Sequence, residues 1–520
     1  MSEPQVHHEQ DKNWLRRFLA RVTRQKHGDI IAVNIGQGAR NVAVGRFVLQ
    51  NNLQIGALVV PVRFILVLLL VAAVAAWVVW YRIVPGQMPP NTFNIAVAEF
   101  GQLGKDGRVY RSEDGSNLSL WMFNQMRLEA ANWPQDRPFE FWHDSLGLLR
   151  KRTPMGVIAT EDQAAALAKR IGAQMVIYGT LDPDQDPAAF TPRFYVDRVV
   201  SETSEIIGGQ NLGMPIAYVT PIRFGETVTG DYFDSQLKPR ARALVWFARG
   251  LALDVQGKFE EALGIFEEAE RRLKPWPADQ GQEVLYVFMG REAMFLAPDA
   301  NEKAGRFKSP DEAIAYAEAR FTEAQALNPS YDRAHLWLGN VYSERAQTIL
   351  ASRQLEQENL KQVWILLDQA AAEYQDAIRD APSPNSVVAV RVQLSLGMLD
   401  YFRAASYLLT YDNASAEPLY RSAIDKILKT LRLVNKDEYR ILAQVYQTLG
   451  AAYYAQGHAS LSEKDKSLEL WNTAIEYYDR CSAQAKAYPY DYFVKNLAQN
   501  RCGPEKQAVV NARGKLESGN

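Results

Sequence analysis

A pair of glycines near the amino end has the spacing of a phosphate-binding turn. Gly36 and Gly38 follow an apolar run, and a glycine turn after a strand can cradle a phosphate on backbone N–H groups. A dinucleotide loop also needs a helix after the turn, because the helix N-terminus must face the phosphate. Here the segment "NVAVGRFVLQ" predicts a second strand, and Asn41 stands in place of the third glycine. The pattern therefore predicts two short strands over 29–50 and no nucleotide site.

The histidines and acidic residues do not form a recognisable metal or catalytic pattern in the sequence. None of the histidines makes a His-x3-His pair or lies at zinc-ligand spacing from a cysteine; they are His7, His8, His27, His143, His335 and His458. The acidic run 182–187 lacks the glycine and terminal glutamate of a calcium loop and predicts a turn. The sequence also lacks a Gly-x-Ser-x-Gly elbow and a Walker loop. We therefore expect no enzyme, no cofactor and no metal.

The chain has two cysteines, Cys481 and Cys502, and both lie near the C-terminus. Two cysteines are too few for a disulfide scaffold or a four-cysteine metal site. In an oxidising compartment the pair can form a disulfide. In the alternative, both are free and buried thiols. The net charge of −2 does not favour a nucleic-acid partner.

One uncharged stretch dominates the amino-terminal part. Residues 64–81, "FILVLLLVAAVAAWVVWY", lie between Arg63 and Arg82 and carry no charge. A helix of that length rises roughly 27 Å, which is enough to cross the hydrocarbon core of a bilayer. Aromatic residues gather at its C-terminal end, where they favour the membrane interface. The stretch predicts a single transmembrane helix and a lipid bilayer as a partner.

Basic residues suggest an orientation for this helix. Residues 1–63 hold nine Lys or Arg against four acidic residues, which places the N-terminus in the cytoplasm. The bulk of the chain is then extracytoplasmic, at the plasma (inner) membrane. Residues 13–26 predict a basic amphipathic helix that lies on an anionic leaflet or packs against a partner. A proline-rich spacer, 82–92, follows the apolar stretch.

Residues 93–225 alternate between strand and helix patterns. A capping box of Thr160 and Gln163 starts one helix, and Gly172 ends it. The order of elements, β-α-β-α-β, predicts a small α/β layer domain. The strands are expected at 93–100, 139–145, 174–181 and 193–200, and the other helix at 117–132.

The pattern "IAVAEF … ALAKRIGAQMVIYGTL" in this region resembles the small amino-terminal α/β domain of TolB-like periplasmic proteins. That domain is known for protein contacts rather than catalysis. The resemblance therefore implies a binding or spacer module outside the cytoplasm.

A spaced motif recurs five times in residues 240–486. Each copy places a small residue four positions before a bulky aromatic residue, and a second small residue or a cysteine three positions after it. The aromatic members are Phe266, Phe321, Tyr374, Tyr420 and Tyr478, and glycines precede them in an earlier helix at Gly250, Gly290, Gly339, Gly397 and Gly450. Two antiparallel helices need small residues where their backbones approach and an aromatic side chain to fill the gap. Because one such pair cannot bury its apolar face alone, the pairs are expected to stack into a solenoid.

This array resembles the tetratricopeptide repeat (TPR), with about five copies, extra residues between some helices, a capping helix at 487–505 and a tail at 506–520. The resemblance implies a concave groove, lined by the first helix of each pair, that grips peptides or partner proteins. The candidates for that groove are Arg291, Arg333, Asn340, Arg391, Tyr401, Gln447 and Tyr454. In the alternative, several of these polar residues only solvate the solenoid.

Together these patterns predict a multidomain chain with a single transmembrane helix, a small α/β domain and an all-α TPR solenoid. The predicted function is a membrane-anchored, single-pass TPR scaffold or adaptor that binds protein or peptide partners on the extracytoplasmic side. The alternative is a transmembrane sensor that relays outer binding to a cytoplasmic partner.

Overall fold

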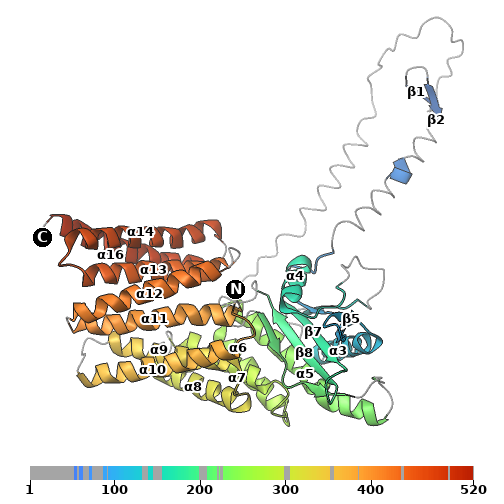
Figure 1. Ribbon diagram of the computed structural model, residues 1–520. Coiled ribbons are helices and arrows are strands. Elements are labelled where there is room, and N and C mark those ends of the chain that lie inside the picture. The colour runs from blue at the N-terminus through green and yellow to red at the C-terminus, as the bar shows by residue number, and fades with distance from the viewer. Residues whose placement is uncertain are drawn as a thin grey trace, which may run out of the picture. The chain divides into compact units, whose positions relative to one another are not determined.

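The computed structural model (Figure 1) describes two separate units of the chain, Met1–Val79 and Trp80–Asn520. The described residues are 52–55, 58–61, 69–72, 86–90, 92–131, 139–144, 155–197, 208–218, 222, 227–297, 305–351, 357–384, 386–410, 412–434, 438–489 and 492–518. In the first unit, β1 (Asn52–Ile55) and β2 (Leu58–Pro61) form an antiparallel hairpin. The amphipathic helix expected at 13–26 and the strands expected at 29–50 lie outside the described residues.

The prediction of a transmembrane helix at 64–81 is wrong. Among the described residues, no helix is both long and apolar enough to cross a membrane. Of the stretch 64–81, the described part is 69–72, a short helical segment whose side chains are exposed. The prediction rested on the absence of charge and on the aromatic residues at one end, and neither of these determines the length of a helix.

The second unit begins with a mixed sheet and two helices, so the small α/β region is present. The main path of the sheet is β10-β8-β7-β3-β6; in addition, β4 pairs with β7 and with β5, and β9 pairs with β8. Strand β3 is parallel to β6 and β7, whereas β7 and β8 are antiparallel. The bounds are β3 Phe93–Val97, β4 Gly101–Leu103, β5 Val109–Arg111, β6 Phe139–Trp142, β7 Met175–Asp182, β8 Ala189–Val196, β9 Gly208–Asn211, β10 Ile216–Ala217, α3 Glu113–Ala131 and α4 Glu161–Ile171.

Alternation along β3 sends its side chains to two different cores. Ile95 and Val97 pack with α3, whereas Ala96 and Ala98 pack with α4. Helix α4 starts at the predicted capping box, in which Thr160 accepts a hydrogen bond from the backbone of Gln163. The two helices therefore cover opposite faces of the sheet.

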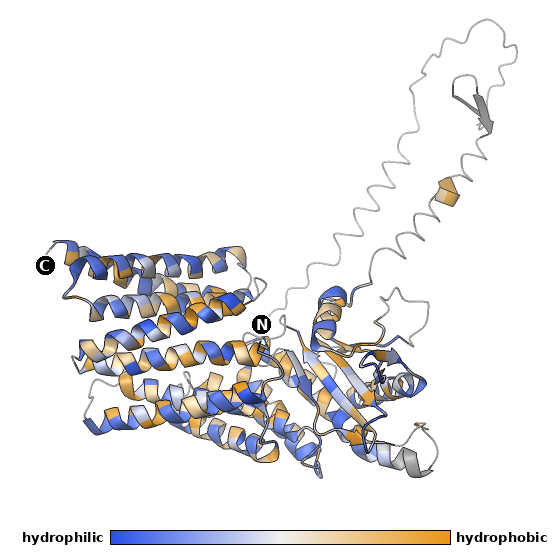
Figure 2. Cartoon of the chain, in the orientation of Figure 1, coloured by the Kyte–Doolittle hydropathy of each residue, from blue (hydrophilic) through white to orange (hydrophobic). Residues whose placement is uncertain are grey.

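Within the described residues of this unit, the ten helices α5 to α14 follow the sheet and pair in sequence order (Figure 1). The pairs are α5 with α6, α7 with α8, α9 with α10, α11 with α12, and α13 with α14. Their bounds are α5 Thr227–Asp254, α6 Phe259–Arg272, α7 Gln282–Leu296, α8 Pro310–Leu327, α9 Asp332–Ala351, α10 Gln357–Asp380, α11 Val387–Leu409, α12 Asn413–Leu433, α13 Tyr439–Ala459 and α14 Lys464–Ala487. Figure 2 shows hydrophilic and hydrophobic residues alternating around these helices, as expected when one side packs on neighbours.

The repeated glycines lie where the two helices of a pair come closest. A Cβ atom built on Gly339 would lie 2.4 Å from a ring carbon of Tyr374, and the first, second and fifth pairs repeat this glycine–aromatic contact. In the fourth pair, Ile427 rather than Tyr420 covers the glycine, Gly397. The small-residue and aromatic positions of the motif are thus explained by helix–helix packing, and the array is TPR-like.

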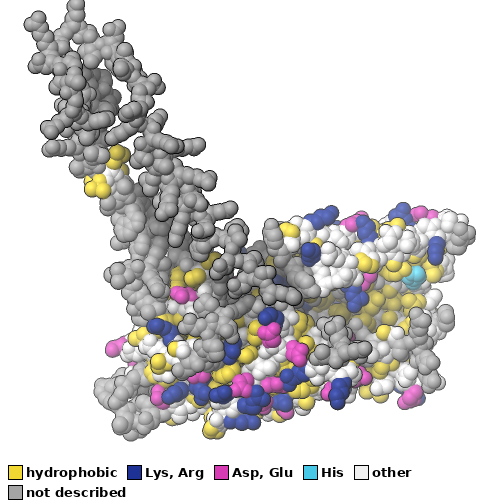
Figure 3. Space-filling view, turned by 180° about the vertical axis from the view of Figure 1, so that it is seen from behind, with side chains coloured by type: hydrophobic (Ala, Val, Ile, Leu, Met, Phe, Trp, Pro, Cys, Tyr) yellow, Lys and Arg dark blue, Asp and Glu magenta, His cyan; other side chains and the backbone are white. Residues whose placement is uncertain are grey.

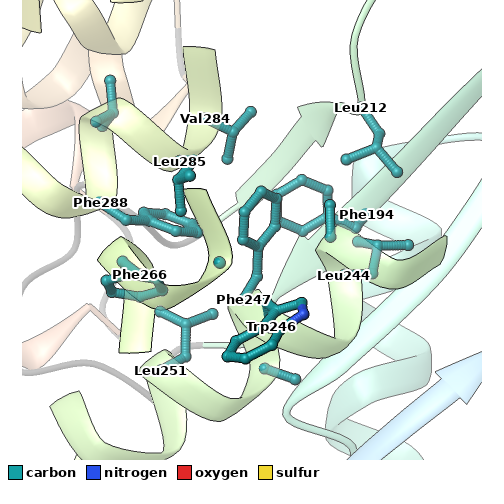
Figure 4. Packing of buried hydrophobic residues seen from close by; sticks show 14 of the residues in the cluster. Phe194, Leu212, Leu244, Trp246, Phe247, Leu251, Phe266, Val284, Leu285 and Phe288 are labelled. Atoms are coloured by element: carbon teal, nitrogen blue, oxygen red, sulfur yellow. The ribbon is translucent and has the colours of Figure 1, made fainter. Parts of the chain in front are cut away.

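One hydrophobic core joins the sheet to the first helices of the array. Phe194 of β8 and Phe288 of α7 lie on either side of Phe247 from α5, with ring centroids 6.1 and 5.3 Å from that of Phe247 (Figure 4). Residues of α6, α8 and α9 belong to the same core. The α/β region and the first repeats are therefore packed together rather than linked only by a connecting segment.

The chain ends in three consecutive helical segments: α15 (Tyr492–Leu497), the short π-helix η3 (Ala498–Cys502) and α16 (Gly503–Ser518). Helix α16 packs on α14. It occupies most of the segment 506–520 that the sequence analysis treats as a tail. The C-terminal cover of the last repeat is therefore longer than the sequence indicates.

Candidate partner-binding groove

A cavity of 480 Å³ opens between the first helices of the third, fourth and fifth pairs. These helices are α9, α11 and α13, which is the side of the array where the TPR resemblance places a groove. The C-terminal segment contributes the remaining wall. The lining residues are Leu336, Asn340, Gln347, Arg391, Leu394, Ser395, Met398, Tyr401, Phe402, Gln444, Gln447, Thr448, Ala451, Leu497, Arg501 and Glu505.

Helical spacing explains why these residues share one surface. On α11, the lining residues recur every three or four positions from Arg391 to Phe402, and such residues lie on the same side of a helix. Residues Gln444, Gln447 and Ala451 repeat the spacing on α13. Amide, hydroxyl and apolar side chains alternate along each helix, so the cavity offers hydrogen bonds between apolar patches.

Arg391 supplies a positive charge to the cavity wall. Its side chain is buried, and it donates a hydrogen bond to the side-chain oxygen of Gln444 on the neighbouring first helix. A guanidinium group held against a second helix is fixed in orientation. It can therefore present its donors to a carboxylate or a peptide carbonyl in the cavity.

Tyr401 and Asn340 are held by aromatic neighbours. The ring of Tyr401 meets that of Tyr420 at 62°, with centroids 5.6 Å apart. Burial, and then the charge of Glu505, raises the pKa of Tyr401 to about 12, so its phenol is neutral at ordinary pH. Asn340 accepts a hydrogen bond of 2.8 Å from the Tyr374 hydroxyl through its side-chain oxygen. This contact fixes the orientation of the amide and therefore of its NH₂ group.

The C-terminal segment closes one side of the cavity. Gln447 donates a hydrogen bond of 2.8 Å to Glu505 of α16, and Arg501 lines the cavity beside it. Cys502 of η3 is joined to Cys481 of α14 in a disulfide. This covalent link holds η3, and the residues that flank it, on the last helix pair.

The structure brings together four of the seven residues that the sequence analysis assigns to the groove: Asn340, Arg391, Tyr401 and Gln447. It places the other three elsewhere. Arg291 is fully buried and lies 2.8 Å from Asp254 and 2.6 Å from Glu292.

The other two also have partners outside the cavity. Arg333 is buried beside Asp332, with an N–O distance of 3.4 Å, where the array meets the α/β region. Tyr454 lies beyond the cavity on α13, with its ring 4.6 Å from that of His458. Neither Arg291 nor Arg333 lines the cavity, and neighbouring protein covers both.

Several lining residues of α13 and of the C-terminal segment were not predicted from the sequence. Gln444 lies one helical turn before Gln447, which was among the predicted groove residues, so helical periodicity was a usable signal for it; Thr448 directly follows Gln447 in the chain. Arg501 and Glu505 carry no such signal, because they reach the cavity through the fold of the C-terminal segment. Outside the groove, one described group of side chains has the composition of a cation site: His335, Glu373 and Asp376.

Basic and acidic side chains are interspersed on the face of the helical array in Figure 3. This mixture differs from the continuous basic surface that nucleic-acid binding requires. A local pattern of charge, rather than a single-sign field, is therefore what this face offers to a partner.

No family model matches the chain, and no curated protein matches it. Among solved structures, the crystal structure of TTC0263, a thermophilic TPR protein of Thermus thermophilus, aligns with 47% of this chain and 97% of its own length. The sequence identity is 17% and the TM-score is 0.26, too low to compare the two chains position by position. The TPR-like nature of the array rests on its helix pairs and glycine–aromatic contacts. The resemblance of residues 93–225 to TolB-like domains stays a prediction.

Proposed function

We propose that this chain is a protein-interaction scaffold that holds an extended segment of a partner protein between α9, α11 and α13. The observation that carries the proposal is the 480 Å³ cavity lined by these three first helices. Its volume falls within the range of roughly 300–1,000 Å³ that is usual for ligand pockets. The proposal gives the groove a binding role and no catalytic step.

The chemistry of the lining suggests what the partner segment looks like. Each residue of an extended peptide presents one backbone donor and one acceptor, and side-chain amides such as Gln347 and Gln444 can match both. Leu394, Met398 and Phe402 offer apolar contact beside them. The guanidinium group of Arg391 favours a carboxylate of the partner next to these apolar contacts. We therefore expect a segment with an acidic side chain between apolar ones.

Photocrosslinking in cells tests this function. A crosslinkable residue at Tyr401 is expected to capture one partner protein, identified by mass spectrometry. The same residue at Ile365, which is 59% exposed on α10, serves as a matched position away from the cavity. Ser395→Trp places a bulky side chain in the cavity and is expected to lower capture at Tyr401 at least tenfold. Equal capture at both positions, or capture that Ser395→Trp leaves unchanged, would refute a role for the groove.

We also propose that the helical array works in an oxidising, extracytoplasmic compartment. The support is the disulfide between Cys481 and Cys502, since such bonds are rare in reducing compartments. Thiols in intact cells are alkylated before lysis, and the mass of the chain is compared with and without prior reductant. No alkylation without reductant is expected. Alkylation of both cysteines without reductant would refute the compartment but would leave the groove proposal standing.

A further inference from the structure

Three side chains from α9 and α10 converge on one point outside the groove. His335 lies in the first turn of α9, and Glu373 and Asp376 lie one turn apart on α10. One nitrogen or oxygen atom of each lies within 4.8 Å of the corresponding atoms of the other two. The two helices are the paired helices of the third repeat, so their packing fixes this convergence.

The orientation of the imidazole is set by a backbone carbonyl. His335 Nε2 lies 2.9 Å from the carbonyl oxygen of Pro329, which can accept only if Nε2 carries the hydrogen. Nδ1 then faces Glu373, with a nitrogen–oxygen distance of 2.7 Å, and the side-chain amide of Gln325 lies 3.2 Å from Nδ1 and 3.4 Å from the Glu373 carboxylate, so a metal ion would have to displace this amide. A histidine that donates one ring N–H to a backbone carbonyl and directs the other nitrogen at carboxylates has the arrangement of a metal ligand.

The surroundings combine a rigid ligand with a movable one. The His335 side chain is 5% exposed, and that of Glu373 is 20% exposed. Asp376 is 39% exposed and forms an ion pair with Arg379, itself 63% exposed. Such an exposed pair is weak and can be given up for a metal ion. Asp376 can therefore turn inward and bring the ligand atoms to the separations that metal–ligand bonds of about 2.0–2.2 Å require.

We propose that His335 Nδ1 and the carboxylates of Glu373 and Asp376 form a binding site for Zn²⁺ or a similar divalent transition-metal ion. Nitrogen and carboxylate oxygen are both ligands that zinc accepts, and a water molecule completes a tetrahedral set of four. The exposed side of Asp376 gives the ion and this water access from solvent. No redox change is involved, and a proton on Nδ1 leaves to solvent as the metal–nitrogen bond forms.

The metal-free protein offers a competing explanation for the same geometry. When His335 is protonated, it forms an ion pair with Glu373, and this hydrogen bond raises the pKa of His335. That pair needs only two side chains. Asp376 therefore separates the two explanations, because the metal site requires its carboxylate and the His335–Glu373 ion pair does not.

A bound ion would act on the junction between the array and the α/β region. It would tie α9 and α10 to the turn that contains Pro329. Tyr331 lies in the same turn and donates a hydrogen bond of 2.7 Å to Gln210 of β9. The ion would thus stiffen the third repeat where it meets the sheet, which is a structural rather than a catalytic role.

Calorimetric titration of the full chain with Zn²⁺ tests the site. The adjacent histidines His7 and His8 are replaced by glutamine in every variant, so that Zn²⁺ binding to these two imidazoles does not contribute to the titration. Against this background, Asp376→Asn is expected to weaken Zn²⁺ binding at least tenfold. Asp380→Asn is the matched control, since Asp380 lies 3.8 Å from His335 Nε2 but outside the ligand set, and its effect is expected to stay below threefold.

The visible absorption of bound Co²⁺ is a second, independent measurement on the same site. Co²⁺ bound in place of zinc is expected to show the strong visible absorption of a tetrahedral site, and Asp376→Asn is expected to remove it. The absence of one-to-one Zn²⁺ binding, or equal Zn²⁺ affinities of the Asp376→Asn and Asp380→Asn variants, would overturn the proposal. These outcomes are independent of partner capture in the groove.

Discussion

The buried charge cluster around Arg291 allows a direct test of what that residue does. Its guanidinium lies 2.8 Å from Asp254 and 2.6 Å from Glu292, and all three side chains are completely inaccessible to solvent. Arg291→Met removes the cation and leaves two carboxyl groups buried without it. Losing one partner of a buried ion pair costs about 3–5 kcal/mol. The charge of Arg440 also acts on Asp254, so we expect the lower end, about 3 kcal/mol at neutral pH.

The loss of stability caused by Arg291→Met is expected to depend on pH. Burial raises the pKa of both carboxyls, and the charge of Asp254 raises that of Glu292 further. Without Arg291, the folded-state pKa values rise again, above those of the unfolded chain. A raised carboxyl pKa favours the folded state at low pH, and this stability is lost as pH rises through the folded value. The difference in stability between wild type and Arg291→Met is therefore expected to shrink as the pH is lowered from neutral.

Equilibrium unfolding in urea, followed by far-ultraviolet circular dichroism, measures this difference. Arg320→Met is the matched control, because Arg320 also faces two carboxylates but is 22% exposed, and its loss is expected to cost less than about 1 kcal/mol. Replacing Arg291, Asp254 and Glu292 together by Met, Leu and Leu should recover most of the stability. Equal free energies of unfolding for the Arg291→Met and Arg320→Met variants would refute a structural role and return Arg291 to the list of surface binding residues.

Three further predictions concern other parts of the second unit. Burial raises the pKa of Glu283 to about 7, so wild type should lose about 3 kcal/mol relative to Glu283→Gln as pH rises from about 4.5 to 7; a pH-independent difference would contradict this. Gly339→Ala should destabilise the chain by about 1–3 kcal/mol in urea titrations, because its Cβ meets Tyr374, whereas Gly264→Ala, with nothing near its Cβ, should be neutral or slightly stabilising. Cys502→Ser opens a disulfide that spans 21 residues and should cost about 3 kcal/mol in thermal or urea unfolding, with no effect if the thiols are reduced in wild type.

The sequence predicted the repeats well because their packing is local. Gly339 and Tyr374 must meet wherever the two helices of the third pair are antiparallel, so their types and spacing already contain the contact. The same argument explains the capping box at Thr160 and Gln163. The prediction for 64–81 failed because its support was hydropathy, flanking arginines and aromatic residues at one end, none of which is a contact between helices. An uncharged run has no partner residues whose spacing can test the interpretation.

The C-terminal contribution to the groove was beyond the reach of periodicity. Glu505 belongs to a helix whose amphipathic pattern is weak, and it meets Gln447 across 58 residues of sequence. The metal-site geometry has the same character, because His335 and Glu373 are 38 residues apart and share no motif. In both cases local sequence patterns show only isolated polar residues. The packing of the helices in three dimensions brings these residues together.

Comparison at equivalent repeat positions shows what periodicity can and cannot fix. Arg291 and Asn340 each lie one residue after the glycine of their first helix, and Arg333 and Arg391 each lie six residues before it. Each pair of equivalent residues therefore starts from the same side of its helix. Yet Asn340 and Arg391 line the cavity, while Arg291 meets carboxylates of α5 and α7, and Arg333 lies where the array meets the sheet.

The position of a residue within its repeat thus determines the side of the helix on which it lies. The segments that pack against that side of the array determine which groups the residue contacts. Tyr401 and Tyr454 show the same limit, since each lies four residues after its glycine but only Tyr401 reaches the cavity. At the equivalent positions, the first helices near the sheet and the first helix of the last pair contact other parts of the protein. The cavity is lined by the first helices of the third, fourth and fifth pairs and by the C-terminal segment, so the groove that we propose for a partner is limited to that part of the array.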